Sequence, residues 1–292
     1  SLALYDGQDW QEHYLGTQDG TIPVVSGLTY DLASVSKVVG VGTLCLFYLQ
    51  AGKLDLDEKL STYYPEVVDK TLTLRQLLSH SSGIDPFIPN RDDLDQAGLI
   101  AAINAIKVRD DKPFLYTDIN FILLGLMLEK VSGQTLDSLF DSEIFQPFGM
   151  SETRFGPVDL AVSTVEGVPA GTVHDPKARV LKEHTGSAGL FSTLKDLEIF
   201  VNHYLMDDFA KNMTQNISQS NKERSVAWDL QGEWILHTGY TGTFVLINIP
   251  AQRAAIFLSN RTYYKDERAQ WIKDRDVLIE IMKKELIRET VE

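Results

Sequence analysis

The sequence is poor in cysteine, in basic residues and in long apolar runs. Its single cysteine, Cys45, excludes an internal disulfide framework and a zinc site built mainly from thiolates. Lysine and arginine total 27 against 41 aspartates and glutamates, so the formal charge of -14 disfavours binding to nucleic acid. The most apolar stretch, residues 38–49, is shorter than the roughly 20 residues that cross a bilayer.

The start of the chain bears on where the protein works. No basic segment followed by an apolar core opens the sequence, so no secretion signal is visible. Residues 1–5 read as the middle of a strand, and we therefore expect that a segment upstream of them has been trimmed. Membrane association would depend on such a segment, and the sequence slightly favours the cytoplasm over the cell surface.

The remaining composition is that of a folded domain with a sizeable core, since 43% of the residues are hydrophobic and 10% are aromatic. Short β-rich runs predict strands at residues 2–5, 10–15, 234–236, 243–249 and 254–258. Helical patterns fill the middle of the chain, and a long amphipathic helix at 267–288 closes it. Strands at both ends predict an α+β fold, with an antiparallel sheet flanked by helices and a helical insertion.

The order of these elements also predicts how the chain is divided. We expect residues 1–54 and 186–292 to form a sheet lobe and residues 55–185 a mainly helical insertion lobe, the two making a single functional unit. Residues 33–50 predict a helix that is apolar on most faces and therefore lies at the centre of the fold. Cys45 lies within this helix, where a thiol has a structural role rather than a nucleophilic one.

The sharpest local motif is Ser34-Val35-Ser36-Lys37, at the start of that helix. Residues three apart are neighbours on one helix face, so Lys37 should lie beside the Ser34 hydroxyl. Burial among apolar side chains would lower the pKa of Lys37 and let its amine accept a proton, while the helix N-terminus favours a developing negative charge. The same spacing arises by chance at helix starts, so alone it does not establish a nucleophile.

A second motif, Tyr116-Thr117-Asp118, enters a predicted helix that ends near Gly133. Tyr116 can project its hydroxyl into a cleft while Thr117 caps the helix. Unless Tyr116 lies near Ser34, ring packing and the favourable position of Asp118 at a helix N-terminus explain both residues.

A third motif, His237-Thr238-Gly239, ends one predicted strand and leads through Tyr240 into the next. Glycine at such a position lets a ligand approach the backbone closely. The same tripeptide occurs at residues 184–186, but that copy precedes a helix rather than a strand. We therefore assign the site to the later copy.

Taken in chain order, the three motifs resemble the signature of the serine β-lactamase and penicillin-binding-protein superfamily. The version is similar to the class C branch, which also includes esterases and D-stereospecific peptidases. Residues 74–84, 116–125 and 189–197 resemble further recurring stretches of that family, and residues 174–176 resemble a loop that lines its cleft. The likeness runs through most of the chain and implies the fold of those enzymes, with hydrolysis through an acyl-enzyme.

The resemblance also implies a role for each motif residue. Ser34 would be the acylated nucleophile, Lys37 would help to deprotonate it, and Tyr116 would act as base and then pass the proton to the leaving group. The backbone N–H groups of Ser34 and Tyr240 would form the oxyanion hole. Four further residues would bind the substrate: Asp118, His237, Thr238 and Gly239.

Two positions depart from the usual family motif. Asp118 stands where Asn is usual, and an ionised carboxylate would favour the charged form of Lys37 if it reaches that lysine. If Asp118 reaches the substrate instead, it should discourage acyl groups that bear a nearby carboxylate. His237 stands where β-lactamases typically have Lys, and its imidazole is mostly neutral at pH 7. Both changes favour esters or amides without a free carboxylate over β-lactams.

The sequence thus predicts a serine hydrolase that forms an acyl-enzyme on Ser34, with Lys37 and Tyr116 as its base pair, and that acts on small esters or amides. One alternative is a D-alanyl carboxypeptidase or esterase that acts on cell-wall components containing D-amino acids. Another is a catalytically degenerate module that keeps the cleft as a receptor. No organic cofactor is expected, and no metal either, because no compact ligand spacing such as His-Glu-x-x-His occurs.

Overall fold

The structure is a computed structural model that describes residues 1–287. Its strands are β1 (Leu2–Tyr5), β2 (Trp10–His13), β3 (Thr29–Asp31), β4 (Arg154–Phe155), β5 (Leu190–Thr193), β6 (Asp229–Gln231), β7 (Trp234–Thr238), β8 (Phe244–Asn248) and β9 (Arg253–Phe257). Its α-helices are α1 (Thr43–Gln50), α2 (Leu60–Tyr63), α3 (Leu74–Leu78), α4 (Gln96–Asn104), α5 (Asp118–Ser132), α6 (Leu136–Phe140), α7 (Gln146–Phe148), α8 (Pro176–Leu181), α9 (Leu194–Met206) and α10 (Arg268–Ile287). Short 3₁₀ or π turns are η1 (Ala33–Val35), η2 (Val38–Gly42), η3 (Arg91–Asp93), η4 (Asp141–Phe145), η5 (Lys182–His184) and η6 (Asp208–Ala210).

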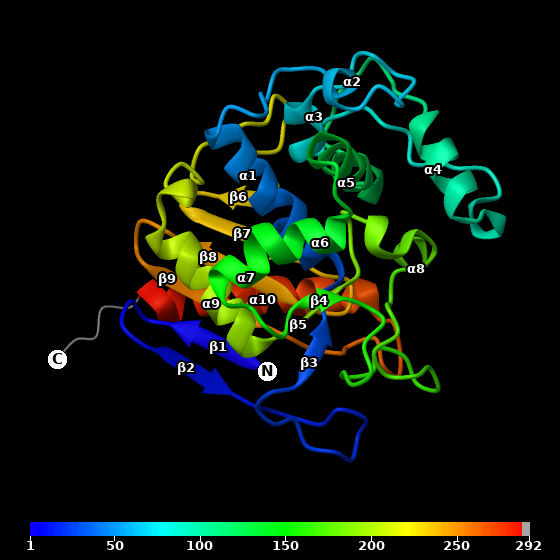
Figure 1. Ribbon diagram of the computed structural model, residues 1–292. Helices are drawn as coiled ribbons and strands as arrows, with labels where there is room; N and C mark the ends of the chain where they lie inside the picture. Colours follow the sequence, from blue (N-terminus) through cyan, green and yellow to red (C-terminus); the bar gives the residue numbers. More distant parts are fainter. Residues whose placement is uncertain (288–292) are drawn as a thin grey trace.

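The main sheet joins the two ends of the chain. Its strands follow the order β2-β1-β9-β8-β7-β6, and every neighbouring pair is antiparallel. The N-terminal strand β1 therefore lies beside β9, with Ala3 opposite Ile256. A second sheet has the order β3-β5-β4. The predicted antiparallel sheet flanked by helices is confirmed (Figure 1), whereas the division into two lobes stays a prediction.

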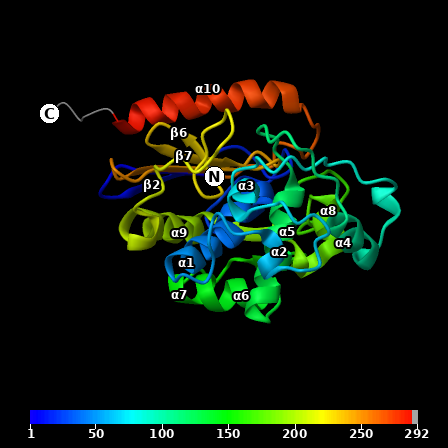
Figure 2. The same cartoon turned by 90° about the horizontal axis from the view of Figure 1, so that it is seen from above.

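Helices cover both faces of the main sheet, as the alternation of side chains along β8 requires. Phe244 and Leu246 pack with Ile279 and Met282 of α10 in one cluster, while Val245 belongs to the larger core on the opposite face. Figure 2 shows α10 running along one face and α9 with α1 beneath the other. The long closing helix predicted at 267–288 is thus placed to bury one side of the sheet; its last predicted residue lies outside the described residues.

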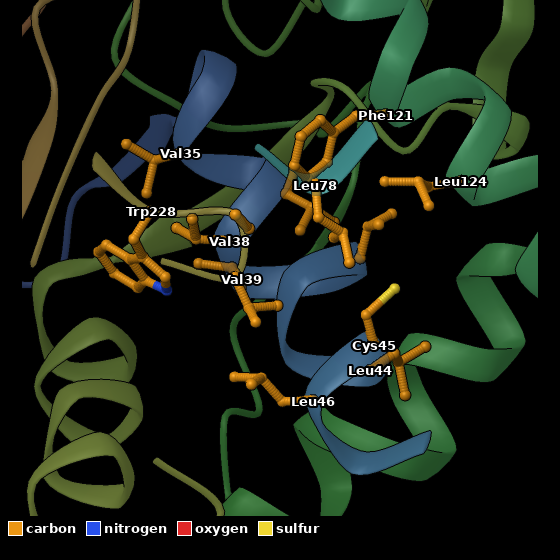
Figure 3. Packing of buried hydrophobic residues seen from close by; sticks show 14 of the residues in the cluster. Val35, Val38, Val39, Leu44, Cys45, Leu46, Leu78, Phe121, Leu124 and Trp228 are labelled. Atoms are coloured by element: carbon orange, nitrogen blue, oxygen red, sulfur yellow. The ribbon is translucent and has the colours of Figure 1, made fainter. Parts of the chain in front are cut away.

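The predicted helix at 33–50 is a continuous helical run with changing geometry. It begins as η1, passes through the π-helical η2 and continues as α1. By length and composition it could cross a membrane, yet 78% of it is buried, as in the core helix of a soluble fold. The predicted burial of Cys45 is confirmed, and burial raises its pKa to about 12, which disfavours a nucleophilic role. Figure 3 shows Cys45 beside Leu44 in the core, with Trp228 on the other side of the helical run near Val38 and Val39.

Side-chain caps fix where the helices next to the cleft begin. Thr73 and Gln76 form a reciprocal capping box on α3, and the Thr117 side chain accepts a hydrogen bond from the backbone N–H of Ile119 at the start of α5. α5 ends at Ser132, and the next residue, Gly133, is its C-cap with a φ of 72° that suits glycine. Helix α4 begins at Gln96 because the Asp95 side chain accepts a hydrogen bond from the Gly98 N–H and so caps it. The cap at Thr117 is what places Asp118 at the first residue of α5.

Candidate active site

Ser34 lies on a strained turn that is held by a buried carboxylate. The preceding residue, Ala33, has a φ of 46°, a left-handed conformation that a non-glycine residue adopts at a cost of about 1–3 kcal/mol. Asp31 holds this turn, since its Oδ1 accepts from the Ala33 N–H at 2.7 Å and its Oδ2 from the His174 N–H at 2.7 Å. Ser34 falls in the first turn of η1, where backbone N–H groups lack helical partners. The turn therefore presents both a hydroxyl and an N–H at its tip.

The structure brings Lys37 to Ser34, as the i, i+3 spacing predicts. The Lys37 ammonium donates to Ser34 Oγ at 2.9 Å, to Asp118 Oδ1 at 2.8 Å and to the Ser187 carbonyl at 2.7 Å. These bonds use all three of its donors, and the side chain is fully buried. Lys37 is therefore locked in one position beneath the Ser34 hydroxyl.

The charge on Lys37 differs from the expectation based on burial alone. Burial would lower the pKa of Lys37, but the charges of Asp118 and Tyr116 outweigh it and hold that pKa above its usual range. Burial would likewise raise the pKa of Asp118, but Lys37 and Lys177 lower it to about 2. The prediction of a depressed lysine pKa is wrong, because Asp118 reaches Lys37 directly. At neutral pH the pair is an ammonium and a carboxylate.

Lys177 is a second cation at the same carboxylate, and sequence reasoning missed it. Its ammonium lies 3.1 Å from Asp118 Oδ2 and 3.8 Å from Asp175 Oδ2, the cap of α8. Asp118 therefore binds one lysine through each oxygen. The available signal was the Asp itself, because a carboxylate in place of the usual neutral amide at a largely buried position calls for an extra cation.

Tyr116 lies over the same lysine and is supported by a buried histidine. The Lys37 ammonium is 5.2 Å from the centre of the Tyr116 ring, and His80 stacks on that ring at 4.3 Å. Burial holds the pKa of His80 well below 6.5, so its imidazole is neutral. His80 Nδ1 faces the Thr117 N–H at 3.4 Å and Asn120 Nδ2 at 2.9 Å, which fixes it as the acceptor nitrogen. His80 thus positions Tyr116, a role that sequence reasoning did not assign.

The third motif runs beside the nucleophile turn. Thr241 Oγ1 donates to the Asp31 carbonyl at 3.0 Å and Thr243 Oγ1 to the Leu32 carbonyl at 3.2 Å. A Cβ on Gly239 would meet the Leu32 carbonyl oxygen at 2.7 Å and Thr243 Oγ1 at 2.2 Å, so only glycine fits. These contacts bring Tyr240, the next residue, close to the turn that carries Ser34.

His237 is buried at the end of β7, and burial holds its pKa well below 6.5. Its Nδ1 faces the Thr238 carbonyl at 3.1 Å, and it carries no charge at pH 7, which fits the expectation of a neutral imidazole. The earlier copy of the tripeptide, at 184–186, was predicted to precede a helix, but strand β5 follows it; β5 belongs to the second sheet, so this copy lies outside the main sheet. The residue after it, Ser187, nevertheless supplies the carbonyl that binds Lys37.

A cleft of about 690 Å³ opens over these residues. Its lining includes the predicted residues Ser34, Tyr116, Asp118, Thr238, Gly239 and Tyr240. Lys37 is buried behind Ser34, and His237 lines a smaller cavity next to the cleft. His174 lines it as well, as the resemblance of residues 174–176 predicts. The charged residues in its lining are the cations Arg91, Lys177, Arg261, Arg268 and Arg275 and the carboxylates Asp118, Asp175 and Asp266.

Arg275 of α10 contacts the third motif, and no pattern in the sequence predicted this contact. Its Nη1 lies 3.4 Å from Thr238 Oγ1. A guanidinium therefore stands beside the motif in which His237 is neutral. Within residues 1–287, no group of three or more His, Cys, Asp or Glu side chains could hold a metal ion. The chemistry that this arrangement can perform is attack by an activated hydroxyl on a carbonyl next to oriented N–H donors.

Three comparisons with known proteins bear on this geometry. The family model described as Beta-lactamase matches residues 2–279. A putative D-alanyl-D-alanine carboxypeptidase of Escherichia coli strain K12 is 26% identical over 89% of this chain and 73% of its own length.

Solved structures share the fold at lower identity. A β-lactamase/D-alanine carboxypeptidase from Yersinia pestis, complexed with citrate, superposes with a TM-score of 0.79 at 16% identity, over 98% of this chain and 92% of that one. EstCE1, a hydrolase with promiscuous acyltransferase activity, superposes with a TM-score of 0.77 at 17% identity, over 95% and 92% of the two chains.

Proposed function

We propose, from the premise that this chain belongs to the beta-lactamase family and is a serine hydrolase, that it hydrolyses small esters or amides through an acyl-enzyme on Ser34. The observation that carries the proposal is the buried Lys37 ammonium, 2.9 Å from Ser34 Oγ and beneath the floor of the cleft. A serine with an oriented charged neighbour and an adjacent tyrosine is what acyl transfer requires.

The proposed mechanism divides the work among four residues. Tyr116 reacts as its phenolate and takes the proton of Ser34 Oγ as that oxygen attacks the substrate carbonyl. The fixed Lys37 ammonium stabilises the negative charge on either oxygen. The backbone N–H groups of Ser34 and Tyr240 bind the oxyanion, and Tyr116 then passes the proton to the leaving group. A water molecule then attacks the acyl-enzyme, with Tyr116 again accepting the proton, and this releases the acyl group from Ser34.

The family premise supports an ester or amide as the substrate, and a neighbour in fold is named a hydrolase with acyltransferase activity. The neutral His237 supports a substrate without a carboxylate next to that residue. A second candidate is a D-alanyl carboxypeptidase, favoured by the Escherichia coli relative and by Arg275 at Thr238, which could bind a peptide carboxylate.

One experiment separates the two candidates. The protein is incubated with a fluorophosphonate, a p-nitrophenyl ester, a penicillin and a peptide ending in D-alanyl-D-alanine, and adducts are read by intact mass. We expect phosphonylation of Ser34 and turnover of the ester, with little penicillin adduct. Release of D-alanine together with a long-lived penicillin adduct would favour the carboxypeptidase instead.

Two variants control this experiment. Ser34→Ala should abolish labelling and turnover and leave the melting temperature nearly unchanged. Ser36→Ala removes a hydroxyl from the same turn, one that accepts the Leu190 N–H, and should keep labelling at Ser34. Equal labelling of Ser34→Ala and of the unmodified protein would refute Ser34 as the nucleophile.

A further inference from the structure

The cleft is cationic although the chain as a whole carries a formal charge of -14. Cations outnumber carboxylates in its lining, and the Lys37 ammonium lies beneath its floor. A local excess of positive charge in an acidic protein raises the concentration of anions at that place. The substrate that fits this cleft therefore carries negative charge.

Two of these cations, Arg261 and Arg268, lie on one aromatic ring. Their guanidinium carbons are 5.1 Å and 5.3 Å from the centre of the Tyr240 ring. Arg268 is the first residue of α10, at the end of that helix nearest α8 in Figure 2. Two like charges on one ring repel each other unless an anion lies near both. The pair is referred to below as the arginine pair.

One carboxylate serves the arginine pair, and it does not satisfy both members. Asp266 Oδ1 lies 2.6 Å from Arg261 Nη1, and its other oxygen accepts from the Tyr240 hydroxyl. Among the described residues no carboxylate forms an ion pair with Arg268. The Arg261 side chain is only 9% exposed and its Nε has no hydrogen-bond partner, which is costly for a buried donor. The pair thus retains unused capacity for an anion.

The position of Tyr240 indicates which part of the substrate would carry this anion. Tyr116, which protonates the leaving group in the proposed mechanism, lies with His237 and Thr238 along a smaller adjoining cavity of about 380 Å³. The arginine pair and Tyr240 line the main cleft and not that cavity. The leaving group would therefore lie toward Tyr116, and the acyl group toward the arginine pair.

We propose, on the basis of the function proposed above, that the acyl group of the substrate carries a carboxylate and that Arg261 and Arg268 bind it beside Tyr240. A planar guanidinium matches a carboxylate with two parallel hydrogen bonds. Asp118 does not oppose such an acyl group, because Lys37 and Lys177 each bind one of its oxygens. The neutral His237 disfavours a carboxylate at its own end of the third motif, where the leaving group would lie, and not one beside Tyr240.

The test compares two p-nitrophenyl esters of equal length, the hexanoate and the monoadipate, which differ in a terminal carboxylate. We expect kcat/KM to be about tenfold or more higher for the monoadipate, because a charge-assisted hydrogen bond is lost with the hexanoate. The preference should shrink as salt is raised, since Arg268 is exposed.

Arg268→Gln should reduce the ratio of the two kcat/KM values by about tenfold, and Arg261→Gln should reduce it as well. Because Arg261 is buried, its variant could unfold, and the exposed Arg268 keeps the test decisive. Arg109→Gln, which removes an arginine outside the cleft, should leave the ratio unchanged.

Equal kcat/KM for the two esters, or a ratio that Arg268→Gln does not change, would overturn the inference while ester turnover upheld the proposed function. Failure to hydrolyse either ester, with no phosphonate label on Ser34, would overturn the proposed function and this inference with it. Retained labelling and turnover with a ratio that responds to Arg268→Gln would support both.

Discussion

Replacing Asp118 by Asn tests the electrostatics of the site most directly. The substitution removes a charge 2.8 Å from a fully buried ammonium but keeps an oxygen that can accept its hydrogen bond. Two unit charges at that distance interact by about 6 kcal/mol at an effective dielectric constant of 20. Removing one partner of a buried pair typically costs about 3–5 kcal/mol. Without that charge burial is the dominant influence on Lys37, and its pKa should fall.

The sign of the effect follows from where the proton of Lys37 is held. In the unmodified protein the folded state raises the pKa of Lys37, so this stabilisation is complete below the unfolded pKa near 10.4 and is lost only above it. In Asp118→Asn burial dominates, and the folded state lowers that pKa. The variant should therefore be less stable by about 3–5 kcal/mol near pH 6, and the difference should narrow as pH rises toward about 9.

Urea unfolding of both proteins between about pH 5 and 9 measures this difference. Asp175→Asn is the matched control, because it removes a carboxylate 3.8 Å from Lys177 and not in contact with Lys37. Because Asn keeps the side-chain oxygen that caps α8, this variant should change the free energy of unfolding little, and by the same amount at every pH in this range. The rate of phosphonate labelling at Ser34 should fall on the acid side of its pH profile, and in Asp118→Asn this fall should occur at lower pH. Parallel stability curves for the unmodified protein and this variant would refute the reasoning.

Two further substitutions probe the rest of the site. Tyr116→Phe should lower kcat for a p-nitrophenyl ester by about 10²–10⁴-fold, the usual contribution of a general acid–base, with an unchanged melting temperature; full activity would remove Tyr116 from the mechanism. Gly239→Ala should lower the melting temperature and phosphonate labelling together, because its Cβ would meet Thr243 Oγ1 at 2.2 Å, an overpacking that costs about 1–3 kcal/mol. An unaltered Gly239→Ala protein would contradict the close approach to the nucleophile turn.

The parts of the site that could be predicted are those set by local spacing. Ser34 and Lys37 are three residues apart in a helical run, so their contact follows from helix geometry. Local caps such as Thr117 could be predicted for the same reason. The association of Tyr116 and His237 with them rested on resemblance, because no local rule joins positions so far apart.

The parts that could not be predicted depend on contacts between distant segments. Lys177 reaches Asp118 from α8, and His80 supports Tyr116 from the segment after α3. The predicted lowering of the Lys37 pKa was wrong for the same reason. Burial lowers this pKa and the charge of Asp118 raises it, and the short distance between the two groups decides which effect is larger. These partners are far apart in the sequence, so no local pattern predicts their contacts, although each contact has an ordinary physical cause.

The pairing of β1 with β9 has a consequence for the timing of synthesis. The first strand of the chain has no neighbour in the main sheet other than β2 until β9 has been made, and α10 follows still later. Such non-local pairing slows folding, because a long loop must close before the contacts form. A ribosome-bound chain from which only the Ser34 turn and Tyr116 have emerged would lack the His237–Tyr240 segment and therefore part of the cleft lining. The hydrolase would thus stay inert during translation at least until the residues of β9 have emerged.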